Sequence, residues 1–435
     1  MTHLEIGFAG IGAVLALIAI RVPIGVALGG VSIVGIILIR GPGVAAGVVK
    51  NTPFEFAANW SISAIPMFLL MGAVAHHSGI SASLFNAARL WLGNLPGGLA
   101  VASNFACAGF SAASGSSLAT AAAMGRITIP EMIGHGYDRG LSTGVVVAAG
   151  TLGSLIPPSI LMVLYGIFAE TSIAQLLIAG VLPGILTAVV YAAMIVTRCA
   201  LDPGLAPPVR ERIPLGRKIA ALGDVWPILV LILGIVGGIY TGLVTPTEAG
   251  AFGAFLSFVI AASQGRMSWA LFRTSVMEAL VGTAKIFFIA IGAVLLTRFL
   301  ALSGVPFFIG EMIGDWALDP LLLVLATSLI YVVLGMFLEP LGLMLLTLPL
   351  LLPMFEALNL DLVWLGVLVI KYLEIGLMTP PVGFNVYIVK SVVGDEVPLG
   401  TIFRGVVWFL ACEVVVVALL VAFPEISLFL PGLMR

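Results

Sequence analysis

The sequence predicts an all-α integral membrane protein built as an inverted structural repeat with two re-entrant hairpins and two broken helices. Three observations support this prediction. The 435 residues are 61% hydrophobic and only 9% charged, whereas soluble domains carry about 25% charged residues. Two apolar segments contain a Pro-Pro pair in their middle, at 157–158 and at 380–381. Prolines also recur at a fixed offset between the two halves of the chain.

Apolar runs define the elements that cross the membrane, because about 20 residues are needed to span a bilayer. Uninterrupted helices are expected near 4–20, 23–40, 55–77, 173–197, 225–243, 246–263, 279–302 and 400–423. The first of these is interpreted as a membrane helix rather than a signal peptide, because no basic segment or cleavage site accompanies it. Amphipathic patterns around 83–91 and 307–316 indicate helices that lie along the membrane interface.

Two further crossings, near 140–168 and 362–391, are expected to be broken helices. They contain Thr151-Leu-Gly-Ser-Leu-Ile-Pro-Pro-Ser159 and Glu374-Ile-Gly-Leu-Met-Thr-Pro-Pro-Val-Gly-Phe-Asn385. Proline lacks a backbone N–H and clashes with the preceding turn, so each helix must break at its proline pair. In a bilayer such a break is tolerated only inside protein or beside a cavity. Two breaks at corresponding positions therefore predict the binding site of a transporter.

Two apolar runs, near 97–128 and 320–352, are interrupted at their centres and are interpreted as re-entrant hairpins. The interruptions are Ser114-Gly-Ser-Ser117 and Leu338-Glu-Pro-Leu-Gly342. A segment of small residues such as the first is also compatible with close helix packing. The hairpin interpretation places both tips near the middle of the membrane.

An offset of 223 residues relates the two halves. It maps Pro23, Pro130, Pro157 and Pro158 onto Pro246, Pro353, Pro380 and Pro381. The same offset aligns the two hairpin tips. The chain is therefore divided into a first repeat at 1–200, a cytoplasmic connection at 201–224 and a second, inverted repeat at 225–435. The helices near 4–20, 23–40, 225–243 and 246–263, which contain no break or tip, are expected to form a static scaffold, and the hairpins and broken helices a mobile domain.

Basic residues predict the orientation in the membrane. One connection contains Arg198, Arg210, Arg212, Arg217 and Lys218, and such clusters mark the cytoplasmic side. Counting helices from there places both termini in the periplasm of a bacterial inner membrane. The first hairpin then enters from the cytoplasm and the second from outside.

The breaks and tips offer groups for anions and for small cations. Half-helix N-termini provide N–H groups and positive dipole ends suited to a carboxylate. Half-helix C-termini and unwound carbonyls suit a hard cation, and nearby hydroxyl and amide side chains add neutral oxygens. Those side chains are Ser114, Ser116, Ser117, Thr151, Ser154, Thr379 and Asn385. Sodium fits this set better than a transition metal, because no cluster of His or Cys lies near the breaks.

Several alternatives remain open at the level of sequence. Glu374 either pairs with Lys371, three residues earlier on one helix face, or contacts an ion or substrate directly. An intramembrane enzyme would need a nucleophile and base inside the apolar runs, and the four histidines lie outside those runs or at their ends. A single-component carboxylate or ion symporter, or a channel-like protein, is the alternative function.

Three motifs resemble those of a known transporter family. They are Ser114-Gly-Ser-Ser-Leu-Ala-Thr-Ala-Ala-Ala-Met-Gly125, Thr245-Pro-Thr-Glu-Ala-Gly250 and Met378-Thr-Pro-Pro-Val-Gly-Phe-Asn385. In this order they are similar to the large membrane (permease, DctM-type) subunit of a tripartite ATP-independent periplasmic (TRAP) transporter. The resemblance covers essentially the whole chain and implies the elevator-type architecture of the ion transporter superfamily. It also implies a transporter subunit rather than an enzyme.

The resemblance implies import of an organic carboxylate solute, driven by Na⁺ as the transported coupling ion, with no organic cofactor. The implied partners are a small four-helix membrane subunit, a periplasmic solute-binding protein and the lipid bilayer, without nucleic acid. Neither protein partner is expected to be fused to this chain. The sodium-binding residues implied are Ser114, Gly115, Ser116, Ser117, Thr151, Gly153, Ser154, Pro157, Leu338, Glu339, Gly342, Gly376, Met378, Thr379 and Gly383. The substrate-binding residues implied are Ser116, Ser117, Pro158, Pro380, Pro381 and Asn385.

Overall fold

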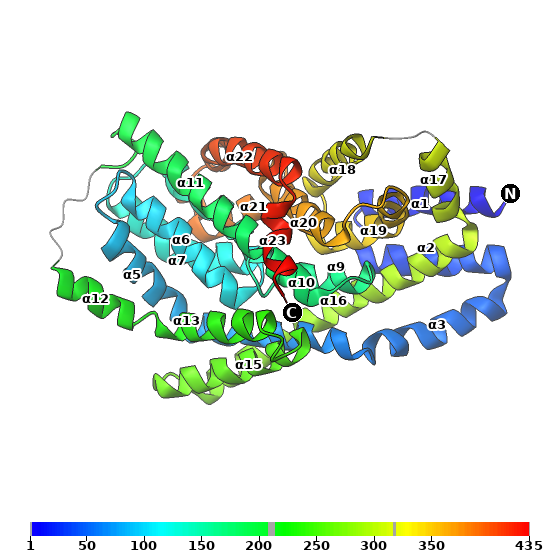
Figure 1. The fold of residues 1–435 in the computed structure, drawn as a ribbon, viewed down its shortest axis with the longest axis horizontal. Helices are drawn as coiled ribbons and strands as arrows, with labels where there is room; N and C mark the ends of the chain where they lie inside the picture. Colours follow the sequence, from blue (N-terminus) through cyan, green and yellow to red (C-terminus); the bar gives the residue numbers. More distant parts are fainter. Residues whose placement is uncertain (1, 208–213, 316–318, 435) are drawn as a thin grey trace.

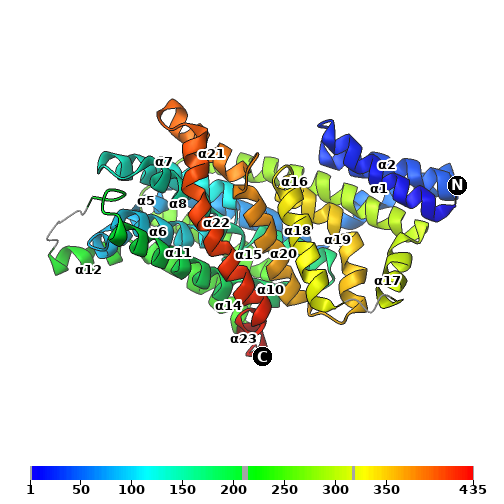
Figure 2. The ribbon, with the colours of Figure 1, turned by 90° about the horizontal axis from the view of Figure 1, so that it is seen from above.

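The computed structural model describes residues 2–207, 214–315 and 319–434. These residues form helices and connections, with no β-strand in the described part of the chain. Figure 1 shows an elongated helical body with the N-terminus at one end and the C-terminus near its centre. The view from above in Figure 2 shows α1 and α2 at one end and α5 and α12 at the other. The predicted all-α class is therefore confirmed.

The segment predicted as the first repeat contains five opening α-helices, a hairpin, a broken helix and a long return helix. Its helices are α1 His3–Ala19, α2 Ile24–Arg40, α3 Pro42–Ala57, η1 Trp60–Ser63, α4 Ala64–His77, α5 Ile80–Leu92, α6 Gly98–Ser114, α7 Ser117–Gly134, α8 Arg139–Gly150, η2 Thr151–Ser154, α9 Ile160–Phe168, α10 Ile173–Ala179 and α11 Val181–Leu201. The hairpin is α6 and α7, and the broken helix runs from α8 through η2 to α9. A short helix, α12 Leu215–Gly223, lies within the predicted connection, whose Arg210 and Arg212 fall outside the described residues.

The second repeat follows the same order. Its helices are α13 Trp226–Ile232, η3 Leu233–Gly237, α14 Gly238–Tyr240, α15 Pro246–Ser263, α16 Trp269–Ser303, α17 Val305–Asp315, α18 Pro320–Gly335, α19 Pro340–Ala357, α20 Leu362–Met378, α21 Phe384–Val393, η4 Gly394–Glu396, α22 Leu399–Ala422 and α23 Glu425–Gly432. The hairpin is α18 and α19, and the broken helix is α20 and α21. Residue 316, at the end of the predicted amphipathic segment, lies outside the described part.

Some predicted helix boundaries are wrong. The helix expected at 55–77 begins only at Ala64, because a separate helix, α3, ends at Ala57 and a 3₁₀ turn follows. Gly41 has a φ of 85° and Pro42 occupies the first turn of α3, and this Gly-Pro start was not recognised as a helix start. The helix expected at 279–302 is longer, since α16 has 35 residues. In the described residues, six helices, or up to seven counting a bent pair, are long and apolar enough to cross a membrane.

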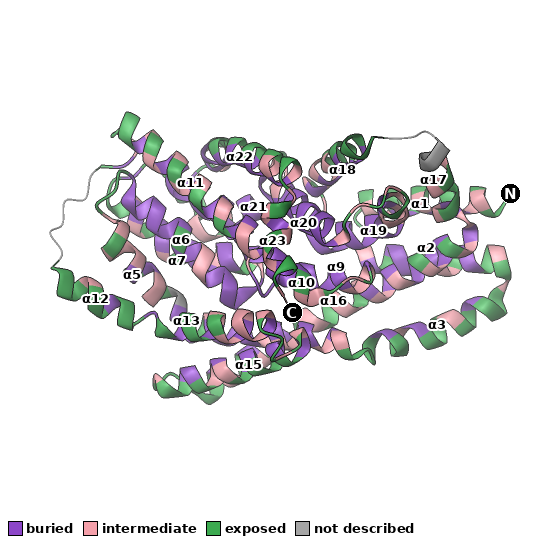
Figure 3. Ribbon diagram, in the orientation of Figure 1, coloured by how far each residue is buried: buried purple, intermediate pink, exposed green. Residues whose placement is uncertain are grey.

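Two groups of helices surround the predicted site. In one group α2 and α4 pack on the long helix α16, and α15 packs on α4. In the other the hairpin helices α6 and α7 pack on α8, and α8 packs on α22. Figure 3 shows buried residues concentrated in the central elements, including α9 and α20, and more exposed residues along α3, α12 and α15. The first break and the first tip therefore lie in the densely packed part of the molecule.

Candidate functional site at the hairpin tips and helix breaks

The first break is buried and the second is partly open. Helix α8 ends at Gly150, and the chain passes through η2 to a cis Pro157-Pro158 bond before α9 begins. Helix α20 ends at Met378, and a cis Pro380-Pro381 bond precedes α21. Pro157 and Pro158 are buried, whereas Pro380 and Pro381 are exposed. The two breaks, which the 223-residue offset relates, thus both contain a cis Pro-Pro bond but differ in how far their prolines are buried.

The first hairpin tip is shaped by Gly115. Its φ of 62° lies in the left-handed region, which glycine adopts without steric cost. A Cβ there would also lie 2.7 Å from the carbonyl oxygen of Pro158. Ser116 then caps α7, its hydroxyl accepting from the N–H of Ala119 at 3.5 Å, and the hydroxyls of Ser114 and Thr120 lie 2.7 Å apart. The tip therefore rests directly on the first break.

Two further contacts fix the first tip on the first break. A Cβ on Gly153 would lie 2.6 Å from the carbonyl carbon and oxygen of Ser116. The hydroxyl oxygens of Ser117 and Ser154 lie 3.0 Å apart. Because these contacts join backbone to backbone and hydroxyl to hydroxyl, the tip and the break form one half-site.

The second half-site is built on the same plan. The 223-residue offset relates Gly153 to Gly376, and a Cβ on Gly376 would lie 2.7 Å from the Cα of Gly335. Gly335 ends α18, just before the second tip. Repeat-related glycines thus allow each broken helix to approach the hairpin beside it.

One cavity joins both tips. It has a volume of about 140 Å³. Its lining residues are Leu69, Gly115, Ser116, Ser117, Leu118, Ser154, Ile160, Leu161, Ile286, Glu339, Pro340 and Leu341. Residues at the N-terminal ends of α7 and α19 line this cavity, so the positive dipole ends of both helices lie beside the same space. Such a cavity suits a carboxylate, with hydroxyl and carbonyl oxygens beside it for a small cation.

The group of helices that contains α2, α4, α15 and α16 supplies apolar cavity residues that were not predicted from the sequence. Leu69 comes from α4 and Ile286 from α16, both outside the hairpins and breaks. Gly72 of α4 also lies close to the first tip, because a Cβ there would be 2.9 Å from the carbonyl oxygen of Ser114. No sequence signal marks these residues, since they resemble any other apolar position of a membrane helix.

Several predicted site residues lie away from the cavity. Asn385 is fully buried, and its amide donates to the carbonyl oxygen of Val147 on α8 at 3.3 Å. The hydroxyls of Thr151 and Thr379 donate to carbonyl oxygens of Ala148 and Ile375, both at 2.6 Å. These three side chains face neighbouring helical backbone in this structure.

Four residues predicted for the second half-site contact other parts of the protein or shape the backbone and do not line the cavity. A Cβ on Gly342 would meet Ile24 of α2 at 2.3 Å. Leu338 is partly buried against the main apolar core, and Met378 is fully buried in the cluster that contains Val386. Gly383, with a φ of 62°, precedes α21. These positions shape the second break and tip, while Glu339 reaches the cavity itself.

Lys371 pairs with a residue other than Glu374. Its Nζ lies 2.7 Å from Oε2 of Glu413 on α22, and it donates to Thr187 of α11 at 3.0 Å. Tyr191 of α11 also donates to Glu413. The hypothesis that Lys371 pairs with Glu374 is therefore wrong, because Lys371 bonds across to α22 and α11 instead. Glu413 was missed, since its role depends on contacts between helices far apart in sequence.

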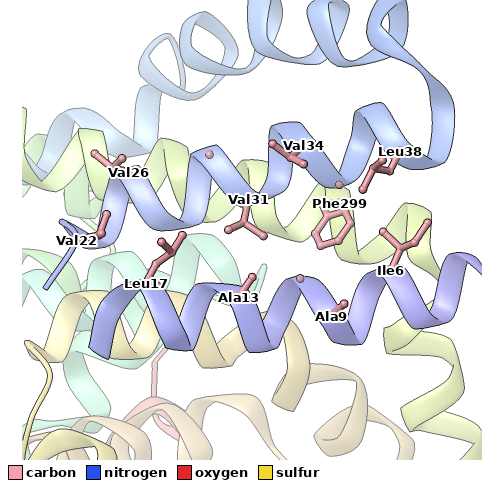
Figure 4. A pocket seen from close by; sticks show the side chains of 13 residues that line it. Ile6, Ala9, Ala13, Leu17, Val22, Val26, Val31, Val34, Leu38 and Phe299 are labelled. Carbon is pink, nitrogen blue, oxygen red and sulfur yellow. The ribbon is translucent and has the colours of Figure 1, made fainter. Parts of the chain in front are cut away.

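A second pocket lies between α1 and α2 and is apolar. Figure 4 shows its labelled aliphatic side chains, with Phe299 of α16 reaching in from a third helix. Its volume is about 520 Å³. These side chains offer no hydrogen bond, so this pocket is unsuited to orienting a charged solute. The cavity between the tips remains the candidate site.

Paired breaks and hairpin tips around one cavity, where three serines and Glu339 lie among aliphatic side chains, define a membrane transport protein. Two solved transporters share the fold. The Alcanivorax borkumensis YdaH transporter aligns with a TM-score of 0.62 at 15% identity, covering 91% of this chain and 90% of that one. Neisseria gonorrhoeae MtrF aligns with a TM-score of 0.57 at 13% identity, covering 88% and 85%.

The family model "Tripartite ATP-independent periplasmic transporter, DctM component" matches residues 11–426, so the chain belongs to this family. It is 36% identical over 385 residues to the C4-dicarboxylate TRAP transporter large permease protein DctM of Pseudomonas aeruginosa, covering 87% of this chain and 88% of that protein. It is 32% identical to the sialic acid TRAP transporter large permease protein SiaM of Vibrio cholerae, covering 89% and 91%. The chain is thus a multi-pass TRAP large permease subunit, and membership implies a periplasmic binding protein and a small membrane subunit.

Proposed function

We propose that this chain imports an organic carboxylate through the cavity between the two hairpin tips, driven by sodium. The observation that carries the proposal is the convergence of the α7 and α19 N-termini on that one cavity. Two helix N-termini favour an anion. Relatives named for C4-dicarboxylates and for sialic acid support an acidic solute.

Sodium is proposed as the coupling ion because each half-site offers oxygen ligands of neutral groups. At the first half-site these are the hydroxyls of Ser116, Ser117 and Ser154 with the carbonyls exposed at the tip and break. Hard monovalent cations prefer such oxygens, and half-helix C-termini add the negative ends of their dipoles. The second half-site offers the equivalent backbone around Gly376 and Gly383.

An elevator movement is proposed for the hairpins and broken helices relative to the scaffold. The support is the division in packing, since α2 and α4 pack on α16 and α15 packs on α4, while α6, α7 and α22 pack on α8. The cavity lies where the two groups meet, with Leu69 and Ile286 on the scaffold side. Sliding one group along the other would carry the site across the membrane.

Reconstitution tests the proposed three-component system. Proteoliposomes that contain this chain with the cognate small membrane subunit, supplied with the cognate binding protein loaded with radiolabelled solute, are expected to accumulate the solute in sodium buffer. Omission of either partner is expected to reduce uptake to the level of empty liposomes. Undiminished uptake by this chain alone would instead favour a single-component symporter.

A further inference from the structure

A buried glutamate of the second repeat contacts the first half-site. Glu374 lies on α20, one turn before the second break, and is only 2% exposed. Its Oε1 accepts a hydrogen bond of 2.9 Å from the hydroxyl of Ser117 at the first tip. The Ser117 and Ser154 hydroxyls are 3.0 Å apart, and because Ser117 donates to the carboxylate, Ser154 donates to Ser117. One chain of hydrogen bonds thus joins the second broken helix, the first tip and the first break.

No salt bridge in the described part of the chain would offset a negative charge on Glu374. Among the described residues no basic side chain forms an ion pair with it, and Lys371, the basic residue one turn away, is engaged by Glu413 at 2.7 Å. The second carboxylate oxygen, Oε2, is buried and has no hydrogen-bond partner in the described structure. A carboxylate buried in a membrane protein is costly unless a positive charge is bound beside it.

The residue type at the position of Glu374 differs between the two repeats. The 223-residue offset places Thr151 where the second repeat has Glu374, and the Thr151 hydroxyl donates to the carbonyl oxygen of Ala148 in its own helix. Only the second repeat therefore carries a charge at this position, and that charge is directed to the serines of the other half-site. Ser117 and Ser154 both line the cavity between the tips.

We propose that Glu374 completes the sodium site of the first hairpin tip, with Oε2 as a cation ligand and Oε1 holding the Ser117 hydroxyl in position. This inference rests on the proposed sodium coupling. Both repeats then contribute ligands to the first cation site, because one ligand comes from α20 and the others come from α7 and η2. Binding of the cation there supplies the positive charge that the buried carboxylate lacks.

The test is the Glu374→Gln variant, which keeps the size and an accepting Oε1 but removes the charge. In the purified full chain, sodium is expected to raise the unfolding temperature, because a ligand that binds the folded state stabilises it. The variant is expected to need about 10- to 150-fold more sodium for half of this effect, since bonds to charged groups contribute about 1.5–3 kcal/mol. Glu356→Gln, at an exposed glutamate of α19, is the matched control and should respond like the wild type.

The outcomes separate this inference from the proposed function. If the wild type itself shows no stabilisation by sodium over potassium, sodium coupling fails. If the wild type responds and Glu374→Gln has the same sodium dependence, the carboxyl is a neutral hydrogen-bonding group and the inference is overturned. Should Glu374→Gln not be recovered folded, the Glu374→Asp variant, which keeps the acidic group but draws it back from Ser117 by one methylene, is measured in the same way. Unchanged sodium affinity in that variant also overturns the inference.

Discussion

Replacement of Lys371 by methionine is expected to lower the free energy of unfolding by about 3–5 kcal/mol, because it leaves a buried charge without its partner. Lys371 and Glu413 are 2% and 1% exposed, and their ion pair measures 2.7 Å. Thr187 and Tyr191 of α11 bond to the same pair. Three helices, α11, α20 and α22, therefore lose their shared polar contact when the lysine is removed.

Thermal unfolding of the purified protein in detergent measures this effect. Lys50→Met, at an exposed lysine of α3, is the control and should unfold at nearly the wild-type temperature. The Lys371→Met/Glu413→Met double variant should recover much of the loss, because a buried pair replaced by apolar residues costs far less than a broken pair. An unfolding temperature of Lys371→Met equal to that of Lys50→Met would contradict the structural role of the pair.

The Gly153→Ala variant is expected to reduce uptake about 5- to 150-fold with the protein still folded. The added Cβ would lie 2.6 Å from the carbonyl carbon and oxygen of Ser116 and 2.8 Å from the N–H nitrogen of Ser117. Backbone atoms cannot rotate away as a flexible side chain does, so the tip must shift off the break. Overpacking of this kind costs about 1–3 kcal/mol, which corresponds to that range at about 1.4 kcal/mol per decade.

Initial rates of solute uptake in reconstituted vesicles, at matched amounts of protein, measure the change. Gly12→Ala is the matched control, because nothing lies within 4 Å of a Cβ at Gly12 on α1. This control should keep full uptake and should be stabilised by less than about 1 kcal/mol through the higher helix propensity of alanine. Equal rates for Gly153→Ala and Gly12→Ala would mean that the tip does not depend on this close approach.

The breaks and tips were predictable from sequence because their signals are local. Proline pairs cannot continue a membrane helix, and the glycine and serines between 114 and 117 mark a chain reversal. Helix α3 was missed because its start depends on Gly41 and Pro42, which read equally well as a simple loop. The long helix α16 was underestimated, since its first turns, from Trp269 onward, carry polar residues that an apolar window excludes.

Contacts between helices distant in sequence were not predictable. Helical spacing suggested a pair between Lys371 and Glu374, yet Lys371 turns to Glu413 and Glu374 turns to Ser117. Both pairings depend on which helices pack together, and this packing cannot be read from a single sequence. For the same reason Asn385 was expected at the cavity, whereas its amide bonds to the backbone of α8.

Sodium-driven uptake is tested most directly by comparing a sodium gradient with a proton gradient as the driving force. Proteoliposomes with the complete transporter are given an inward sodium gradient in one experiment, and an inward proton gradient in potassium buffer without sodium in another. The carboxylate solute is expected to accumulate above its external concentration only with the sodium gradient. Equal accumulation with the proton gradient alone would contradict sodium-driven uptake.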